Sequence, residues 1–261
     1  MAFIDGRPAT AEDLAALGLT NYGHYTSMLV TDGRVRGLGL HLERLVRDCR
    51  AVFGADLDPG RVRAYAGAAA RAGSGTFVVR VTVYDPAIGL ATTHRRGEPH
   101  VLVTVRPAGG TDAPPLRVRP VPFQRDVPEV KHTGLFGPLH ARREARLAGY
   151  DDALFVDPAG HVSEGTTWNV GLYDGRDVVW PEAGVLPGVT MTLLQRAHPY
   201  VVRPVPAELR NVEAVFATNS SFGVRPIARV GEAAFPAVHP IMDELSAAYL
   251  ALPLDPLDPP D

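Results

Sequence analysis

The residue of this 261-residue chain that points most directly to chemistry is Lys131. It is the only lysine, and every other strongly basic side chain is Arg. An Arg guanidinium stays protonated, whereas a desolvated Lys amine can lose its proton and form a Schiff base with a carbonyl compound. We therefore interpret Lys131 as a covalent attachment point. The alternative is an ordinary surface lysine that remains by chance in an Arg-rich chain.

A carboxylate follows Lys131 in a setting of small residues. Glu164 stands between Ser163 and Gly165, just after a predicted strand. Taken alone, this pattern is typical of a turn cap or a solvated side chain. Beside a Schiff-base lysine, a buried carboxylate has a further role, because it can keep a pyridine nitrogen protonated and so make the ring electron-withdrawing.

Two later segments offer hydrogen-bond donors for a phosphate group. The sequence LPGVT at 186–190 opens a predicted helix, so the N–H groups of Val189 and Thr190 and the Thr190 hydroxyl form a phosphate cup. Ser220 and Ser221, in a loop after a strand, add two hydroxyls. The alternatives are a simple helix cap by Thr190 and plain loop residues at 220–221.

Two arginines are candidates for binding anionic groups. Arg44, in the sequence HLERL at 41–45, suits bidentate phosphate binding, although an exposed helix residue is the alternative. Arg95 lies in a predicted loop and is a candidate anchor for a substrate carboxylate, with plain surface charge as the alternative.

Together these motifs resemble the class IV aminotransferases, the fold-type IV pyridoxal-phosphate enzymes. This family includes branched-chain and D-amino-acid aminotransferases and aminodeoxychorismate lyases. The resemblance runs from about Asn21 to Ile227. It implies pyridoxal 5'-phosphate as cofactor, bound between a small N-terminal α/β domain and a larger C-terminal domain, and a homodimer whose partner subunit completes the substrate pocket. By this resemblance the matching residues are Lys131 (Schiff base), Glu164 (pyridine nitrogen), Arg44, Val189, Thr190 and Ser220 (phosphate) and Asn169 (structural).

The chain also departs from the transaminase pattern. Phe136 stands where many transaminases of the family carry a Tyr, and His132, Tyr25–Ser27 and Thr218–Asn219 resemble the lyase branch more closely. His24 and Tyr25 are expected near the substrate, unless they only begin a core strand. The resemblance implies amino-group transfer between an amino acid or amine and a keto acid, with β-elimination of the aminodeoxychorismate lyase type as the alternative. A non-catalytic cofactor-binding protein is a third hypothesis.

The composition of the chain excludes several classes of protein. Hydrophobic residues make up 46% and charged residues 21% of the chain, as in soluble globular proteins. A net charge of −3 argues against a general nucleic-acid binder. No apolar stretch is long enough to span a membrane, no secretory signal is visible, and no metal site is predicted. The single Cys49 excludes an internal disulfide and fits a reducing compartment, so we expect a cytoplasmic protein.

The predicted elements give an α/β class, of the α+β two-domain kind. The first half is expected to contain a strand at Thr26–Thr31, a hairpin turn at Asp32–Gly33, helices at Leu38–Phe53 and Arg61–Ala72, and strands at Thr76–Tyr84 and His100–Arg106. The second half is expected to contain an extended segment at Leu116–Pro122, a helix from Pro138 to Gly149, strands at Ala153–Val156, Asn169–Tyr173, Val178–Trp180 and Glu213–Ala217, and helices at Thr190–Ala197 and Ile241–Leu250.

A Pro- and Gly-rich stretch suggests the domain boundary. We predict a small N-terminal α/β domain at 1–107, a linker at 108–115 and a larger cofactor-binding domain at 116–261. The last ten residues contain four prolines, and we expect this tail to be extended or loose rather than a helix or strand.

Overall fold

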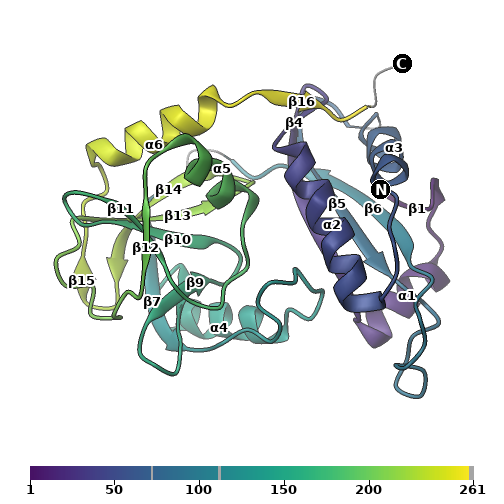
Figure 1. The fold of residues 1–261 in the computed structure, drawn as a ribbon, viewed down its shortest axis with the longest axis horizontal. Helices are drawn as coiled ribbons and strands as arrows, with labels where there is room; N and C mark the ends of the chain where they lie inside the picture. Colours follow the sequence, from purple (N-terminus) through teal and green to yellow (C-terminus); the bar gives the residue numbers. More distant parts are fainter. Residues whose placement is uncertain (72, 111–112, 259–261) are drawn as a thin grey trace. The chain divides into compact units, whose positions relative to one another are not determined.

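The computed structural model describes residues 1–71, 73–110 and 113–258. Ala72 of the second predicted helix, Thr111 and Asp112 of the predicted linker, and the last three residues of the predicted tail lie outside this description. The chain divides into two compact units. Both contain helices packed on β-sheet (Figure 1), which confirms the predicted α/β class.

The first unit consists of Met1–Gly109, Val130–Gly134 and the chain from Pro253 onward. Its antiparallel sheet has the order β16-β4-β3-β5-β6-β1-β2. The strands are β1 (Ala2–Ile4), β2 (Arg7–Pro8), β3 (Gly23–Thr31), β4 (Arg34–Arg36), β5 (Thr76–Tyr84), β6 (His100–Pro107) and β16 (Leu254–Pro256). Asp32 and Gly33 join β3 to β4 with φ values of 49° and 72°. These positive values are those of the tight hairpin turn that the sequence predicts.

Helices cover both faces of this sheet. Helix α2 (Leu38–Phe53) packs against β3, and α3 (Pro59–Ala70) packs against β5 and β6 (Figure 1). Alternate strand residues point to the same face, so Val79, Val81 and Val83 share one core with these two helices. Tyr84 and Leu102 belong to a separate cluster with the partly buried Leu17 of α1 (Ala11–Thr20).

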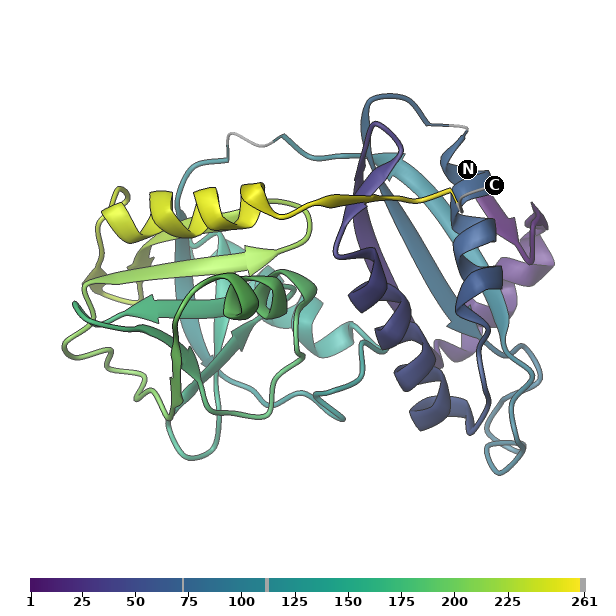
Figure 2. The same cartoon turned by 45° about the horizontal axis from the view of Figure 1, so that its top comes forward.

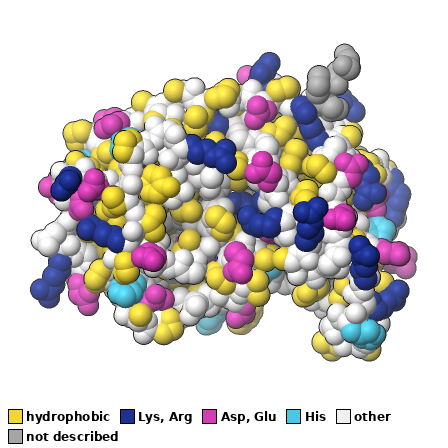
Figure 3. Space-filling model, viewed as in Figure 1, with side chains coloured by type: hydrophobic (Ala, Val, Ile, Leu, Met, Phe, Trp, Pro, Cys, Tyr) yellow, Lys and Arg dark blue, Asp and Glu magenta, His cyan; other side chains and the backbone are white. Residues whose placement is uncertain are grey.

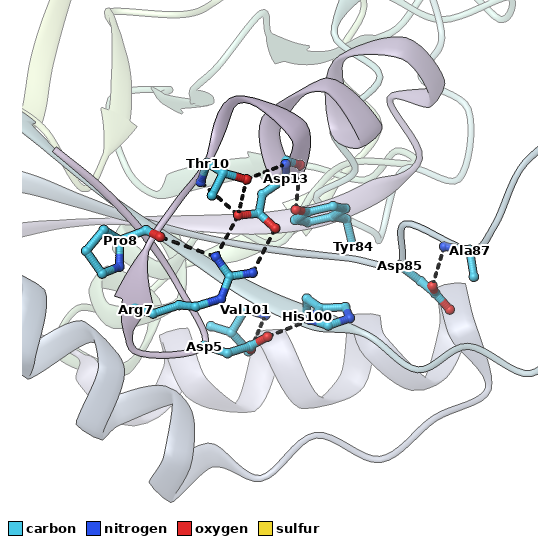
Figure 4. A network of polar contacts seen from close by, with 10 residues as sticks. All are labelled: Asp5, Arg7, Pro8, Thr10, Asp13, Tyr84, Asp85, Ala87, His100 and Val101. Atoms are coloured by element: carbon cyan, nitrogen blue, oxygen red, sulfur yellow. Dashed lines mark hydrogen bonds and ion pairs between the residues drawn. The ribbon is translucent and has the colours of Figure 1, made fainter.

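The sequence analysis did not predict α1, which a local polar network holds in place (Figure 4). The Asp13 carboxylate accepts hydrogen bonds from the backbone N–H and hydroxyl of Thr10 and from Arg7. The Arg7 guanidinium and the Thr10 donors hold the pKa of Asp13 well below its usual value. Tyr84 ties α1 to the sheet by donating its hydroxyl to the Asp13 carbonyl at 2.7 Å.

The second unit consists of Gly110–Glu129 and Leu135–Leu252. Strand β9 pairs with both β8 and β10, so the strands β10, β13, β14, β7, β8 and β9 close into a ring. Its strands are β7 (Leu116–Pro122), β8 (Asp152–Val156), β9 (Val162–Gly165), β10 (Asn169–Tyr173), β11 (Val178–Pro181), β12 (Val201–Arg203), β13 (Ala214–Asn219), β14 (Gly223–Val230) and β15 (Ala233–Ala234). Buried side chains of these strands, including Val118, Leu154, Val170, Ala217 and Ile227, form its largest core.

Three helices pack on this ring. Helices α5 (Val189–Ala197) and α6 (Pro240–Ala251) lie against each other and against β13 and β14, respectively (Figure 2). Helix α4 (Phe136–Leu147) packs against β8. No helix among the described residues has the length and hydrophobicity that a membrane crossing requires. Acidic and basic side chains are interspersed on the face drawn in Figure 3.

Several local predictions need correction. Helix α4 begins at Phe136, two residues before Pro138, because a proline fits anywhere in the first turn, where its missing N–H has no intrahelical acceptor. Glu164 lies within β9 rather than after a strand. The proline-rich tail contains a strand, β16, which pairs with β4 at the sheet edge, where prolines are tolerated.

The compact units also differ from the predicted boundaries. The segment Val130–Gly134 and the chain from Pro253 onward pack in the first unit, although both fall within the predicted C-terminal domain at 116–261. Backbone hydrogen bonds explain the difference, because Thr133 donates to the Gly23 carbonyl and Leu257 to the Gly33 carbonyl.

Candidate active site

Lys131 lies on a short extended segment that is hydrogen-bonded to β3. Tyr25 donates its N–H to the Lys131 carbonyl at 2.8 Å, and Thr133 donates its N–H to the Gly23 carbonyl at 2.8 Å. His132 forms a β-bridge with His24. The Lys131 N–H donates to the Asp48 carboxylate at 3.0 Å. The main chain on both sides of this lysine is therefore held, which fixes the point from which its side chain extends.

The side chain of Lys131 extends over an aromatic ring. Its Nζ lies 4.9 Å from the centroid of the Tyr25 ring, and the guanidinium carbon of Arg80 lies 3.7 Å from the same centroid. Tyr25 is 6% exposed. The cationic groups of Lys131 and Arg80 thus both lie near the Tyr25 ring, whose π-face attracts cations electrostatically. The structure brings Tyr25 and Lys131 together, as the sequence-based site requires.

Helix α2 presents three polar side chains at helical spacing toward the interior of the first unit. His41, Arg44 and Asp48 are separated by three and four residues, so they lie on one face of the helix, and all three are buried. Asp48 accepts from Arg47 at 2.7 and 3.0 Å and from the Lys131 N–H. Asp48 escaped the sequence analysis, because a carboxylate one turn after Arg44 looks like a surface helix residue.

Burial changes the ionisation of these groups. Desolvation lowers the pKa of Arg44 to about 10, against the opposing attraction of Asp48. Burial also lowers the pKa of His41 well below its ordinary value, and the charges of Arg44 and Lys131 act in the same direction. His41 is therefore neutral, and its Nδ1 shares a hydrogen bond of 2.7 Å with the Thr26 hydroxyl.

His24 is completely buried in the first unit and packs against Phe53 at a centroid distance of 5.9 Å. Burial lowers the pKa of His24 to about 3, with Arg47 acting in the same direction. This position favours the core-strand alternative for His24 over a substrate contact. Arg95, the other candidate substrate residue, is exposed in the loop between β5 and β6, with its N–H donated to Thr92.

In the second unit, Glu164 forms a buried ion pair that the sequence analysis missed. The Glu164 Oε1 accepts from Arg125 Nε at 2.8 Å, and the two side chains are 4% and 9% exposed, respectively. Arg125 also donates to the Thr166 carbonyl at 3.3 Å. A guanidinium and a carboxylate at this distance form a short, charge-assisted hydrogen bond. The sequence around Arg125 does not indicate that it pairs with Glu164, which lies 39 residues further along the chain.

Strand register explains how Glu164 joins the other candidate residues. Asn169 of β10 pairs with Glu164 of β9 on one side and with Thr218 of β13 on the other. Residues that are directly opposite in antiparallel pairs are close neighbours on one face. All three side chains are buried. Asn169 donates its amide to the Leu186 carbonyl at 2.7 Å, so this row of residues also positions the start of α5.

The beginning of α5 has the features of an anion site. Gly188 precedes Val189, the first helical residue, and no side chain caps this helix. A Cβ at Gly188 would collide with the Asn169 Oδ1, so only glycine allows this close approach. The Thr190 and Thr218 hydroxyls are both buried with no hydrogen-bond partner among the described residues. Buried hydroxyls without partners are costly, which suggests that a ligand satisfies them.

Ser220 and Ser221 lie in the turn between β13 and β14. The Asn219 Oδ1 accepts from the N–H groups of Ser221 and Phe222 at 2.9 and 3.1 Å, which holds the turn in place. Because α5 packs against β13, Val189, Thr190, Thr218 and Ser220 all belong to one part of the second unit. Val189 and Thr190 therefore lie on a helix that packs against β13, the strand that carries Thr218 and precedes the turn with Ser220.

The structure thus provides two groups of candidate residues. The first unit carries the group of Lys131, Arg44, Tyr25 and Asp48, and the second unit carries the group of Glu164, Arg125, Asn169, Val189, Thr190, Thr218 and Ser220. Phe136, at the position of the family tyrosine, is 82% exposed at the start of α4 and stacks on His140. The buried hydroxyls, the open helix start and the glycine cradle fit a phosphorylated cofactor.

Comparisons with known proteins show which proteins this chain resembles. A segment of 99 residues is 29% identical to a probable branched-chain-amino-acid aminotransferase of Aquifex aeolicus (strain VF5); it spans 34% of this chain and only 32% of that relative. A branched-chain aminotransferase from Thermoproteus uzoniensis shares the fold at a TM-score of 0.83 and 22% identity, with 95% and 93% of the two chains covered. A 4-amino-4-deoxychorismate lyase from Pseudomonas aeruginosa has a TM-score of 0.78 and 25% identity, with 95% and 97% covered.

The family match covers both groups of candidate residues. The pattern of the family described as amino-transferase class IV matches residues 23–230. This range includes every candidate residue from His24 to Ser221 and well over half of the chain. The chain therefore belongs to the class IV aminotransferases.

Proposed function

We propose that this protein is a pyridoxal 5'-phosphate-dependent aminotransferase that moves an amino group between an amino acid or amine and a keto acid. The observation that carries the proposal is the setting of Lys131. The only lysine of the chain has its main-chain N–H and carbonyl both hydrogen-bonded within the first unit, and its amine lies against an aromatic ring. Membership of the class IV aminotransferases supplies the cofactor for such a lysine.

When bound, pyridoxal phosphate supplies a carbonyl carbon that condenses with amines and a ring that withdraws electrons from the carbon next to the substrate nitrogen. Lys131 would hold the cofactor covalently through its Nζ. Its amine, when free, would be the base that takes and returns the proton at the substrate carbon. The hydrogen bonds to Asp48 and Tyr25 keep the lysine main chain in place during both tasks.

Glu164 would keep the ring nitrogen protonated, which is the state that withdraws electrons most strongly. Arg125 holds the carboxylate in one orientation through its hydrogen bond of 2.8 Å. In the second unit, the N–H groups of Val189 and Thr190 and the hydroxyls of Thr190 and Ser220 would bind the phosphate. In the first unit, Arg44 is the candidate for the same role. The Thr218 hydroxyl, which is buried and has no hydrogen-bond partner within the described part of the chain, would be an additional donor.

A lyase of the aminodeoxychorismate type is the second candidate. It is favoured by the likeness to the Pseudomonas aeruginosa lyase over 95% of this chain and by Phe136 at the position of the transaminase tyrosine. Both reactions use Lys131 and Glu164 in the same roles. They differ in whether the released amino group passes to a keto acid or whether the substrate side chain leaves with release of pyruvate.

The oligomer and the compartment follow from the same proposal. We expect a cytoplasmic homodimer in which the partner subunit completes the substrate pocket, because the candidate residues of one chain serve the cofactor and few remain for the substrate. Tyr25 is the remaining substrate-facing candidate, since its ring already lies beside the Lys131 amine. Light scattering should give a mass of about twice 28.0 kDa.

The test begins with the covalent link. Borohydride reduction of the cofactor-loaded protein, followed by peptide mass analysis, should place the label on the peptide that contains Lys131. Lys131→Arg keeps the charge and should lose both the label and the visible absorbance. A label that appears only at the N-terminal amine would refute the proposal.

A second assay separates the two reactions. D- and L-amino acids are supplied with a keto-acid acceptor, and aminodeoxychorismate is supplied without one. Product formation that requires the acceptor identifies the aminotransferase. Pyruvate release from aminodeoxychorismate without an acceptor identifies the lyase.

A further inference from the structure

The second unit contains an arginine-lined cavity away from the candidate cofactor residues. Its volume is about 590 Å³, and its walls come from β7, α4, the segment that follows α4, the β9–β10 connection and β14. Four guanidinium groups line it, those of Arg117, Arg142, Arg146 and Arg225, with the carboxylates of Asp151 and Asp152. Four positive charges against two negative ones leave the lining with an excess of two positive charges.

The two carboxylates are already engaged by two of these arginines. Arg142 binds Asp152 through two hydrogen bonds of 2.7 and 3.1 Å, and Arg117 binds Asp151 through two of 3.3 Å. Planar guanidinium groups bind carboxylates in this two-point manner. The charges within each of these two pairs cancel.

Among the residues that the structure describes, the other two guanidinium groups form their hydrogen bonds with main-chain carbonyls. Arg225 also lies 5.9 Å from the centroid of the Phe222 ring and is attracted by Asp151 and Asp152. Arg146 donates to the Asp151 carbonyl at 3.2 Å, and Arg225 donates twice to the Pro114 carbonyl at 2.6 and 2.9 Å. A carbonyl accepts these hydrogen bonds but does not neutralise the charge. Burial lowers the pKa of Arg225, so its guanidinium is partly removed from water as well. Both groups retain N–H donors for an anion.

We propose that this cavity is a binding site for a small anion with two or more carboxylate or phosphate oxyanion groups, held by Arg146 and Arg225. Its volume is within the range of small-molecule sites. The aromatic side chains of Tyr150, Trp168 and Phe222 form another part of the wall. The site is separate from the proposed aminotransferase chemistry and does not depend on it.

Hydrogen bonds connect the lining of the cavity to the segment after Glu164 and to the segment before Ser220. Arg142 donates to the Thr167 hydroxyl at 2.7 Å, and Thr167 follows Glu164 by three residues. The Thr167 carbonyl accepts from the Asn219 amide, next to Ser220, at 3.4 Å. The wall of the cavity at Thr167 therefore connects strand β9, which carries Glu164, to the turn that carries Ser220.

Calorimetric titration of the cofactor-loaded protein tests the site, because the cofactor then fills the predicted phosphate cup. The probes are pyrophosphate and, separately, succinate, each against sodium chloride at matched ionic strength. We expect saturable binding of at least one probe at one site per chain. The double variant Arg146→Gln/Arg225→Gln should bind it at least tenfold more weakly.

The matched control is Arg119→Gln/Arg143→Gln. It removes the same charge from two exposed arginines of β7 and α4 that do not line the cavity. This control should bind the probe as the unmodified protein does. Unliganded melting temperatures confirm that both double variants are folded, and the single variant Arg225→Lys, which keeps the charge, should bind with intermediate affinity. Absence of saturable binding by both probes, or equal weakening in the control, overturns the proposal. If no cofactor binds at all, the proposed function fails, whereas the cavity titration can still be read on the protein as purified.

Discussion

Breaking the buried pair of Arg125 and Glu164 should destabilise the second unit and reveal a strong coupling between the two side chains. The Nε–Oε1 distance is 2.8 Å, and the side chains are 9% and 4% exposed, respectively. At an effective dielectric constant of about 20, two unit charges at this distance attract by roughly 6 kcal/mol, which desolvation offsets in large part. Removal of one partner of a buried pair typically costs about 3–5 kcal/mol, because the other charge is left uncompensated.

We therefore expect Glu164→Gln and Arg125→Gln each to lower the free energy of unfolding by about 3 kcal/mol. The double variant removes both charges and should lose clearly less than the sum of the two single losses, with a coupling of about 2 kcal/mol or more. Urea unfolding of the cofactor-free protein, followed by tryptophan fluorescence, measures this directly. Both tryptophans, Trp168 and Trp180, lie in the second unit, so the signal reports this unit.

The pair of Arg229 and Glu232 is the matched control. It lies in the same unit at the same distance of 2.8 Å, but the side chains are 42% and 88% exposed. Solvent-exposed pairs contribute about 0–1 kcal/mol, so the control cycle should give a coupling within that range. A coupling between Arg125 and Glu164 as small as that of the control would refute the argument from burial. The turnover rate distinguishes the catalytic role of Glu164 from the positioning role of Arg125. Glu164→Gln should lower this rate roughly a hundredfold, whereas Arg125→Gln keeps the carboxylate and should lower it less.

Three further predictions concern other buried polar groups. The pKa of His24 falls from 6.5 to about 3 on folding, so between these pH values the unfolded chain binds one more proton than the folded chain. The free energy of unfolding therefore decreases as the pH falls, and at pH 5 this decrease is roughly 2 kcal/mol. In denaturant titrations, His24→Leu should reduce this dependence of stability on pH, whereas the exposed control His94→Leu should leave it unchanged. The same pH dependence in the unmodified protein and in both variants would show that His24 is not its source. Thr218→Val removes a buried hydroxyl that has no hydrogen-bond partner in residues 1–71, 73–110 and 113–258. It should therefore raise the melting temperature of the cofactor-free protein and weaken cofactor binding severalfold. A lower melting temperature would mean that the hydroxyl has a partner in the protein. Asp48→Ala removes the acceptor of the Lys131 N–H and should slow the appearance of the cofactor's visible absorbance about tenfold, with Asp48→Asn slowing it less; equal rates in the two variants would show that the carboxylate does not position the lysine.

The sequence alone determined the elements whose signals are local. Helix α2 has the predicted bounds because its apolar residues recur at helical spacing and Gly54, with φ of 61°, ends it. The turn at Asp32–Gly33 is predictable because only a few residue types accept positive φ values. Strand β9 and strand β16 escaped prediction, since short strands are specified by the neighbours with which they pair rather than by their own sequences.

The candidate site can likewise be divided into features that the sequence predicts and features that only the folded structure provides. The chemistry of Lys131 could be inferred from the sequence, because an amine is the one cationic side chain that forms a Schiff base and this chain has only one. Its main-chain partners could not be inferred, because Asp48 lies 83 residues away and the lysine segment packs in the first unit. Likewise the sequence named Glu164, Asn169 and Thr218, but strand register alone made them neighbours. Residue type sets which reactions a side chain can perform, whereas contacts distant in sequence form only when the chain folds.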